Sequence, residues 1–180
     1  MVAEGFEAGG HNGREETTTF TLIPMVRERV TIPLIAAGGI ANGRGMLAAM
    51  VLGADGVQVG SRFVASEESS SHIAFKKMVV EAKEGDTLLT LKELAPVRML
   101  KNKFFEDLMK LYETNPTTEE LKELLGRARA KRGMFEGDLV EGELEIGQIA
   151  GLIHDIKPAA QIVREMVEEF QLAKSQVKEL

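Results

Sequence analysis

Short apolar runs, each followed by a glycine-rich turn, recur along the first third of the chain. Such runs suit strands that are buried on both faces, as in a parallel sheet covered by helices. We expect these strands in the opening residues and at residues 34–37 and 57–63. Between them, apolar residues at helical spacing predict helices within residues 17–30 and 45–52. The β–α–β–α–β order is typical of a parallel α/β sheet, open or closed.

The pattern of hydrophobic positions changes after residue 64. Amphipathic periodicity predicts mainly helices, with one short strand at residues 87–91 and a loop at 133–147. The predicted helices are 69–84, 97–112, 118–132 and 158–174. The buried side of the last helix is expected to carry Ile162, Val163, Met166, Val167 and Phe170. Residues 65–180 therefore form a mainly helical second part.

Composition narrows the classes of function. A chain of 180 residues with 44% hydrophobic residues is long enough to bury a sizeable core. Its formal net charge of −6 disfavours a general surface for nucleic acid or an anionic membrane. The absence of cysteine excludes disulfides and thiolate catalysis, and it fits the cytoplasm. No pair of His or carboxylate residues has convincing metal-ligand spacing, so no metal site is expected.

Two glycine turns that follow successive strands carry the strongest functional signal. One contains Gly38 and Gly39, and the other contains Gly60 and Ser61. Glycine lets the backbone approach an anion closely, and neighbouring parallel strands bring their turns together. The alternative is that these glycines only form tight turns. The spacing is not that of a dinucleotide fingerprint, so the sequence favours one phosphate of a mononucleotide cofactor.

His11 follows the first predicted strand, on the side where the glycine turns lie. An imidazole there could give or take a proton beside a bound cofactor, or it could only hydrogen-bond its own loop. Glu4 and Glu7 alternate on the same strand, and either could face the cavity or be satisfied by loop amides. We expect the acidic stretch 136–145 to be a solvated loop. The small, apolar segment 146–152, with one buried amide, is typical of a pocket wall.

Three motifs, in order and with comparable spacing, resemble the C-terminal part of the nitronate monooxygenase family. This family was formerly called 2-nitropropane dioxygenase, and it includes the FMN-dependent enoyl-ACP reductases. The motifs are Glu4-Gly5-Phe6-Glu7-Ala8-Gly9-Gly10-His11-Asn12-Gly13, Ala36-Ala37-Gly38-Gly39-Ile40 and Gly53-Ala54-Asp55-Gly56-Val57-Gln58-Val59-Gly60-Ser61-Arg62-Phe63. Residues 147–152 are similar to the reductase branch, so the resemblance covers nearly the whole chain.

The resemblance implies the C-terminal portion of a TIM (β/α)8 barrel, with a helical extension. Residues 2–6, 34–37 and 57–60 would be strands six to eight, so that 1–64 is a partial FMN-binding barrel and 65–180 completes the flavin-enzyme domain. Such barrels bind phosphate after strands seven and eight. By resemblance, Gly38, Gly39, Gly60 and Ser61 would hold the FMN phosphate, Glu4, Gly9 and Gln58 would line the cofactor, and His11 would be the catalytic acid–base.

The chain also departs from the family pattern. Glu4 stands where many relatives carry Gln, and Ser61 stands where Thr is common. Strands one to five are absent, which indicates a fragment of a longer enzyme, because three strands cannot close a barrel.

The resemblance implies an oxidoreductase that uses O₂ to oxidise alkyl nitronates. The alternative within the family is an enoyl-ACP reductase that acts on an enoyl thioester, with NAD(P)H as electron donor. A third interpretation is an inactive fragment, which could form a homodimer through its open sheet edge. A dehydrogenase of the inosinate type is disfavoured because it requires a thiol nucleophile.

Overall fold

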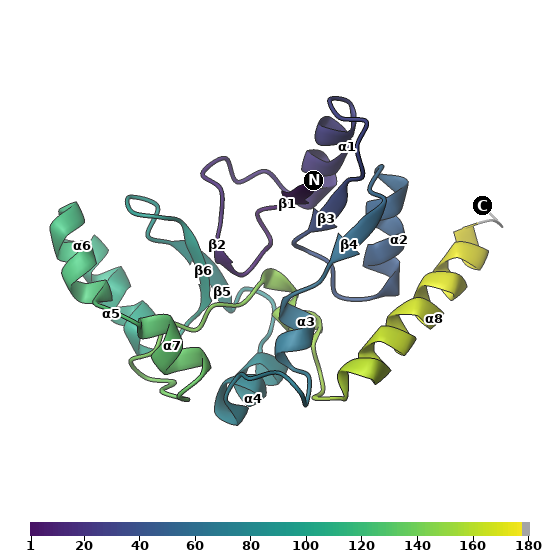
Figure 1. The fold of residues 1–180 in the computed structure, drawn as a ribbon. Coiled ribbons are helices and arrows are strands. Elements are labelled where there is room, and N and C mark those ends of the chain that lie inside the picture. Colours follow the sequence, from purple (N-terminus) through teal and green to yellow (C-terminus); the bar gives the residue numbers. More distant parts are fainter. Residues whose placement is uncertain (178–180) are drawn as a thin grey trace.

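The computed structural model describes residues 1–177, which form two three-stranded sheets surrounded by helices (Figure 1). One sheet is parallel, in the order β1-β3-β4, and the other is antiparallel, in the order β2-β6-β5. The strands are β1 (Val2–Glu4), β2 (Gly10–His11), β3 (Ile35–Ala37), β4 (Gly56–Gln58), β5 (Thr87–Thr90) and β6 (Val97–Leu100). The predicted α/β class and the parallel order of the first part are confirmed.

Eight helices and one 3₁₀ turn connect and cover the sheets within residues 1–177. They are α1 (Thr19–Arg27), α2 (Gly43–Val51), α3 (Ser61–Val64), α4 (Ile73–Glu81), α5 (Lys103–Tyr112), α6 (Thr118–Leu125), α7 (Arg129–Met134), the 3₁₀ turn η1 (Gln148–Leu152) and α8 (Ala159–Val177). Figure 1 shows α1 and α2 beside the parallel sheet and α5 to α7 beside the antiparallel sheet. None of these helices has the length and apolar composition needed to cross a membrane.

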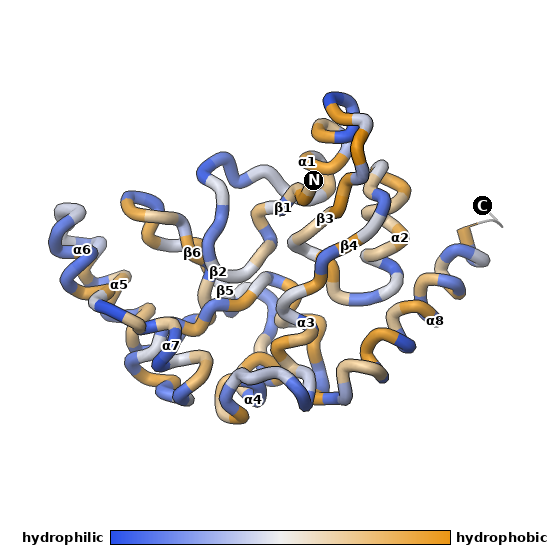
Figure 2. The backbone as a smooth tube through the Cα atoms, in the orientation of Figure 1, coloured by the Kyte–Doolittle hydropathy of each residue, from blue (hydrophilic) through white to orange (hydrophobic). Residues whose placement is uncertain are grey.

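The first helices begin and end where local chemistry predicts. The Asn42 side chain accepts a hydrogen bond from the Gly45 N–H at 3.0 Å, which caps α2. Gly53 follows that helix with a φ of +110°, a conformation that favours glycine. Ile23 of α1 packs with Leu34 and Ala36 in a core between the helices and the parallel sheet. Figure 2 shows β3 in the colour of hydrophobic residues. The strand tips of this sheet are thereby fixed at one edge.

The predicted helix at 97–112 is wrong in its first third. Residues Val97–Leu100 are strand β6, which lies between β5 and β2 and is buried along its whole length. The helix begins at Lys103, where the Asn102 side chain accepts from the Phe105 N–H at 3.0 Å. A short apolar run fits either a strand or a buried helix by periodicity. Here the segment forms a strand because it pairs with the two neighbouring strands β2 and β5.

The predicted helix at 118–132 is two helices, α6 and α7. Gly126 and Ala128 between them have φ values of +63° and +57°, which ends the helical backbone. The guanidinium of Arg129 donates to the carbonyls of Leu124 and Leu125, at 2.7 and 2.8 Å. These bonds satisfy carbonyl groups at the end of α6. The break therefore comes from backbone conformation that the apolar stripe did not reveal.

The last helix, α8, packs on α2 through a narrower stripe than predicted. Ile162 and Met166 are buried, whereas Val163 and Val167 are 50% and 46% exposed. The prediction that these two valines face the core is wrong, because α8 contacts mainly one neighbour, α2. A helix with one partner buries fewer positions per turn than a helix enclosed on several sides.

The placement of β1, β3 and β4 as strands six to eight of a barrel stays a prediction, as does the division of the chain after residue 64. Strand β2, from the first part, pairs with β6, from the second. The two parts therefore share the antiparallel sheet. This sharing brings the loop of His11 against the helical part.

Candidate functional site

A cavity of about 240 Å³ lies where the carboxyl ends of β1, β3 and β4 meet the 146–149 segment. All seven residues predicted to bind the cofactor line it, namely Glu4, Gly9, Gly38, Gly39, Gln58, Gly60 and Ser61. The side chain of His11 is not among the lining residues, although its neighbour Gly10 is. The structure thus gathers the strand tips around one space, and His11 follows a residue that lines it.

The backbone of the Gly38–Gly39 turn strongly favours glycine. The φ values are +84° and +69°, in the left-handed region that side chains rarely adopt. A Cβ at Gly38 would lie 2.7 Å from the Gly5 carbonyl oxygen, which is backbone and cannot move aside. The N–H of Gly39 donates no hydrogen bond within residues 1–177. This turn is therefore demanded by the fold and also presents a free donor.

The Gly60–Ser61 turn, unlike the Gly38–Gly39 turn, does not need glycine for its backbone conformation. Gly60 has a φ of −100°, which any residue adopts, and a Cβ there would meet no atom within 4 Å. Neither Gly60 nor Ser61 uses its N–H in a hydrogen bond to the described residues. No contact with residues 1–177 explains glycine at position 60. The open space beside two free N–H groups is what close approach by an anion requires.

Ser61 also connects this turn to the wall of the cavity. Its Oγ accepts a hydrogen bond from the Gly147 N–H at 2.9 Å. Gly147 lies so close to Gly9 that a Cβ at Gly9 would be 2.4 Å from the Gly147 nitrogen. Close packing against this wall therefore explains glycine at position 9. The hydroxyl proton of Ser61 remains available to a bound ligand.

The two carboxylates of the first strand and its loop have different partners. Glu7 accepts hydrogen bonds from the Thr19 N–H, at 2.9 Å, and from the Thr19 hydroxyl, at 3.0 Å. It caps α1, so the amide that satisfies it belongs to the first residue of a helix and not to a loop, and Glu7 also lines the cavity. Glu4 has no hydrogen bond within the described residues, and loss of water around its carboxyl raises its pKa. The Gln58 amide is likewise unbonded, and both groups face the cavity.

His11 does not simply follow the first strand, because it belongs to β2 and pairs with Val97 of β6. Beneath its loop, the buried Arg98 stacks on the Phe6 ring at 4.4 Å and donates to the Phe6 carbonyl at 3.0 and 3.2 Å. Burial lowers the pKa of this guanidinium, and the charges of Glu7 and Glu16 oppose that shift. Arg98 thus fixes the start of the loop that carries His11. The sequence predicted a helix at 97–112 and therefore did not indicate this role of Arg98.

The acidic stretch 136–145 is not a solvated loop at its end. Glu143 is 6% exposed, and Glu145 lines the cavity. The alternation Glu143-Leu144-Glu145-Ile146 is the signal that could have shown this, because period two is typical of a half-buried extended segment. The 146–152 segment does form part of the wall, through Ile146 and Ile149. Its amide at Gln148 is exposed, contrary to expectation.

The charged side chains that line the cavity restrict where an anion could be held. Among the described residues that line it, Glu4, Glu7 and Glu145 are acidic and none is Lys, Arg or His. An anion can therefore be held only by backbone N–H groups and the Ser61 hydroxyl, at the glycine turns. The remaining carboxyls suit the uncharged, hydrogen-bonding part of a ligand.

Comparison with known proteins identifies a family that the chain matches. The family model described as nitronate monooxygenase matches residues 1–169. A probable nitronate monooxygenase of Staphylococcus haemolyticus is 40% identical over 150 residues, which are 76% of this chain and 42% of that protein. A second, from Staphylococcus saprophyticus, is 34% identical over 90% of this chain and 48% of that protein. The chain therefore spans less than half the length of these curated relatives.

Solved structures give the same result. FabK from Thermotoga maritima is 44% identical, with a TM-score of 0.92 over 99% of this chain and 56% of that one. A nitroalkane oxidase from Streptomyces ansochromogenes is 30% identical, with a TM-score of 0.76 over 98% of this chain and 52% of that one. The architecture of residues 1–177 is thus similar to roughly half of each larger protein.

Proposed function

Because the chain belongs to the nitronate monooxygenase family, we propose that it is the C-terminal part of an FMN-dependent oxidoreductase that oxidises alkyl nitronates with O₂. The observation that carries the proposal is the convergence of two glycine turns on one cavity. Free N–H groups of Gly39, Gly60 and Ser61 point to a phosphate there. A barrel-type phosphate site after the last two strands has this arrangement.

The residues present fit one end of FMN. The cavity of about 240 Å³ is smaller than the roughly 300–1,000 Å³ typical of small-molecule and cofactor sites. The glycine turns and the Ser61 hydroxyl would hold the phosphate, while Glu4 and Gln58 would lie along the rest of the cofactor. We infer that strands outside this chain complete the barrel and contact the remainder of the flavin.

The chemistry divides between cofactor and protein. Bound FMN would supply electron transfer between substrate and O₂. His11, which follows the lining residue Gly10, would manage a proton next to the nitro carbon, because an imidazole exchanges protons near neutral pH. The Gly9–Gly147 contact and Arg98 would hold the loop of His11 in place, since both fix its backbone.

An FMN-dependent and NAD(P)H-dependent enoyl-ACP reductase is the second candidate. Two observations favour it. Residues 147–152 resemble the reductase branch, and they form the turn η1 against the cavity. Identity to the nitroalkane oxidase is also lower than identity to FabK, 30% against 44%. In this alternative His11 would help to protonate the reduced enoyl thioester.

Anaerobic reduction of the flavin separates the two candidates. FMN is added to the purified chain, and its absorbance is followed after addition of either a secondary alkyl nitronate or NADH without oxygen. Bleaching by the nitronate alone supports the monooxygenase, and rapid bleaching by NADH supports the reductase. Failure to bind FMN would count against both for this chain. The cytoplasmic location and a homodimer stay predictions.

A further inference from the structure

Helix α3 carries the Gly60–Ser61 turn at its start, and it is too short to hold that turn by itself. The helix spans four residues, Ser61–Val64, and no side chain of the described residues caps its first turn. The Gly60 carbonyl accepts two hydrogen bonds from N–H groups of the helix, at 2.9 and 3.2 Å. A single helical turn is unstable in isolation. Contacts from other segments must therefore fix the direction in which the free N–H groups of the turn point.

Arg62 makes such a contact between α3 and the segment that leads into α8. It is the buried residue of this helix, at 8% exposed. Its guanidinium donates to the backbone carbonyl of Asp155 at 3.1 Å and to the carboxylate of the same residue at 2.6 Å. Figure 1 shows α3 below β4, beside the chain that runs into α8. Because the donor is charged, both bonds are stronger than bonds between neutral groups.

The partner of Arg62 is held in place by contacts of its own. The Asp155 carboxylate also pairs with Lys157 at 2.9 Å, and Lys157 pairs with Glu165 of α8 at 2.9 Å. The backbone of Lys157 forms a parallel bridge with Ser66, just after α3. Burial opposes the shift, but the hydrogen bonds and charges of Lys157 and Arg62 keep the pKa of Asp155 below its ordinary value. The anchor is therefore a carboxylate at neutral pH, on backbone that other contacts fix.

An arginine directly after a phosphate-binding turn could instead bind the phosphate itself. The geometry is against this interpretation. Gly60, Ser61 and Val64 are among the described residues that line the cavity, whereas Arg62 and Asp155 are not. Turning the guanidinium toward the cavity would break its bonds to Asp155 and separate two paired charges, one of them largely buried, which is costly. The position of Arg62 therefore suits support of the turn from behind.

We propose that the Arg62–Asp155 ion pair is a positioning element of the phosphate end of the cavity, and that it fixes α3 so that the donors of the Gly60–Ser61 turn converge on one phosphate. The identity of the ligand rests on the proposed function. Ser61 is held from the cavity wall by the Gly147 N–H at 2.9 Å, and α3 is held on its other side by Arg62. A turn that is fixed from two sides loses less conformational freedom when a ligand binds. Both members of the pair act through the turn and not by contact with the ligand.

The preference of the chain for FMN over riboflavin tests this role, because riboflavin lacks the phosphate. Calorimetry on the full chain gives both Kd values for Arg62→Met and for Asp155→Asn. We expect each variant to reduce the preference at least about threefold by raising the Kd for FMN, while the Kd for riboflavin stays the same. Arg62→Lys keeps the charge and should retain part of the preference. A loss in Arg62→Met alone would indicate direct contact with the phosphate and would overturn the positioning role, as would an unchanged preference in both variants.

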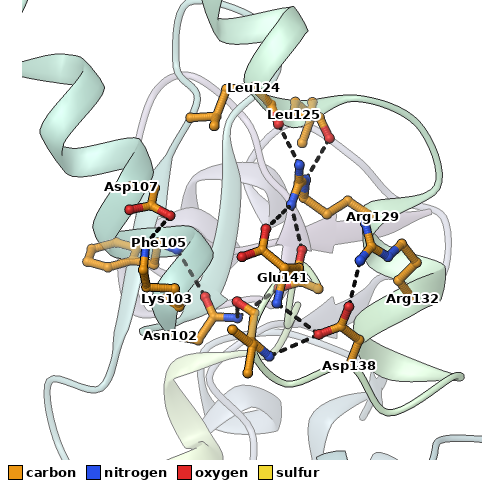
Figure 3. A network of polar contacts seen from close by, with 12 residues as sticks. Asn102, Lys103, Phe105, Asp107, Leu124, Leu125, Arg129, Arg132, Asp138 and Glu141 are labelled. Atoms are coloured by element: carbon orange, nitrogen blue, oxygen red, sulfur yellow. Dashed lines mark hydrogen bonds and ion pairs between the residues drawn. The ribbon is translucent and has the colours of Figure 1, made fainter.

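Two further variants separate positioning from a general loss of stability. Asp155→Asn leaves a buried guanidinium without its counter-charge, whereas the double variant Arg62→Met with Asp155→Asn removes both charges. Because the two residues act as one pair, their effects on the preference should not add. The matched control is the Arg132–Asp138 ion pair at 2.7 Å, drawn in Figure 3, of which neither member is among the described residues that line the cavity. Asp138→Asn should leave the preference unchanged, and an equal loss there would contradict the proposal.

The anchor is also tested without any ligand. Amide ¹⁵N relaxation on the labelled chain reports the motion of the Gly60 and Ser61 N–H groups. We expect both to become more mobile in Asp155→Asn, while Gly39, in the other glycine turn, keeps the values of the unmodified chain. Unchanged relaxation at Gly60 and Ser61 would refute the anchor. If the unmodified chain binds neither flavin, the proposed function fails for this chain, and the relaxation data alone decide whether the ion pair holds the turn.

Discussion

The cavity has two unlike ends. At one end, the turns at Gly38–Gly39 and Gly60–Ser61 are built from backbone, with N–H groups that no other residue of the described chain uses. At the other end, Glu145 faces the cavity with the buried Glu143 behind it. The first end needs only short local sequence to form. The second depends on packing between segments that are distant in the chain, because residues 143–146 run along β6.

Two glycines at the backbone end of the cavity differ in backbone conformation and in the space around them. Gly38 has a left-handed backbone, and its Cβ would strike the Gly5 carbonyl, whereas Gly60 has an ordinary backbone and open space. Stability therefore accounts for the first glycine, and we propose that ligand approach accounts for the second. Substitutions can separate these two causes.

Replacing Gly38 should have the largest effect. We expect Gly38→Ala to lower the free energy of unfolding by about 2–4 kcal/mol, because a side chain there combines a strained backbone with a backbone clash. Urea unfolding followed by circular dichroism measures this loss. Gly85→Ala is a matched control, since it also has positive φ but its Cβ meets nothing within 4 Å. Equal losses at both positions would show that strain alone matters.

The carboxyl end should make stability depend on pH. The pKa of Glu143 is raised in the folded chain from 4.5 to about 7. Its favourable contribution is therefore full below pH 4.5 and is lost as pH rises toward 7. We expect the free energy of unfolding to fall by about 2–3 kcal/mol over this range relative to Glu143→Gln. Urea unfolding at several pH values measures the difference, and parallel curves for the two proteins would refute it.

Gly60→Ala should leave the fold intact while weakening the ligand. At an ordinary φ, alanine restricts the unfolded chain, so stability should stay the same or rise by about 0.4–1 kcal/mol. A methyl group in the open space should raise the Kd for FMN at least about tenfold, or about 1.4 kcal/mol. Isothermal calorimetry gives the Kd. Unchanged affinity would mean that the phosphate lies elsewhere.

Ser61→Ala should have the smallest effect. The Gly147 N–H loses its acceptor, so we expect a loss of about 1 kcal/mol in unfolding free energy. FMN should bind a few-fold more weakly, because one donor is removed. Ser61→Thr keeps the hydroxyl and should restore both properties. Thermal unfolding with FMN titration tests the pair of variants, and a Thr variant as weak as Ala would count against the hydroxyl.

The sequence predicted the two glycine turns of the backbone end, for physical reasons. The strand predicted at 57–63 is wrong in its second half, because β4 ends at Gln58 and Ser61–Val64 is helix α3. Strands followed by glycine, and a helix capped by Asn42, are local signals that tertiary packing does not alter. The strand Val97–Leu100 was missed because so short a segment, with three apolar residues and Arg98, fits either a strand or a helix by periodicity. Its pairing with β2 and β5 is what makes it a strand. Glu143 was missed for the same reason, since its burial comes from α7 and β6. The sequence did indicate His11 as a candidate. Its position on β2 could not be predicted, because β2 forms by pairing with β6 of the second sheet.

The most direct measurement compares FMN with riboflavin, which lacks the phosphate. Calorimetry on the chain should give a Kd for FMN at least about tenfold lower than for riboflavin, because the glycine turns hold the phosphate. Gly60→Ala should reduce this ratio toward one, while Gly85→Ala should preserve it. Equal affinities for the two flavins, or a ratio that Gly60→Ala leaves unchanged, would contradict a phosphate site at the strand tips.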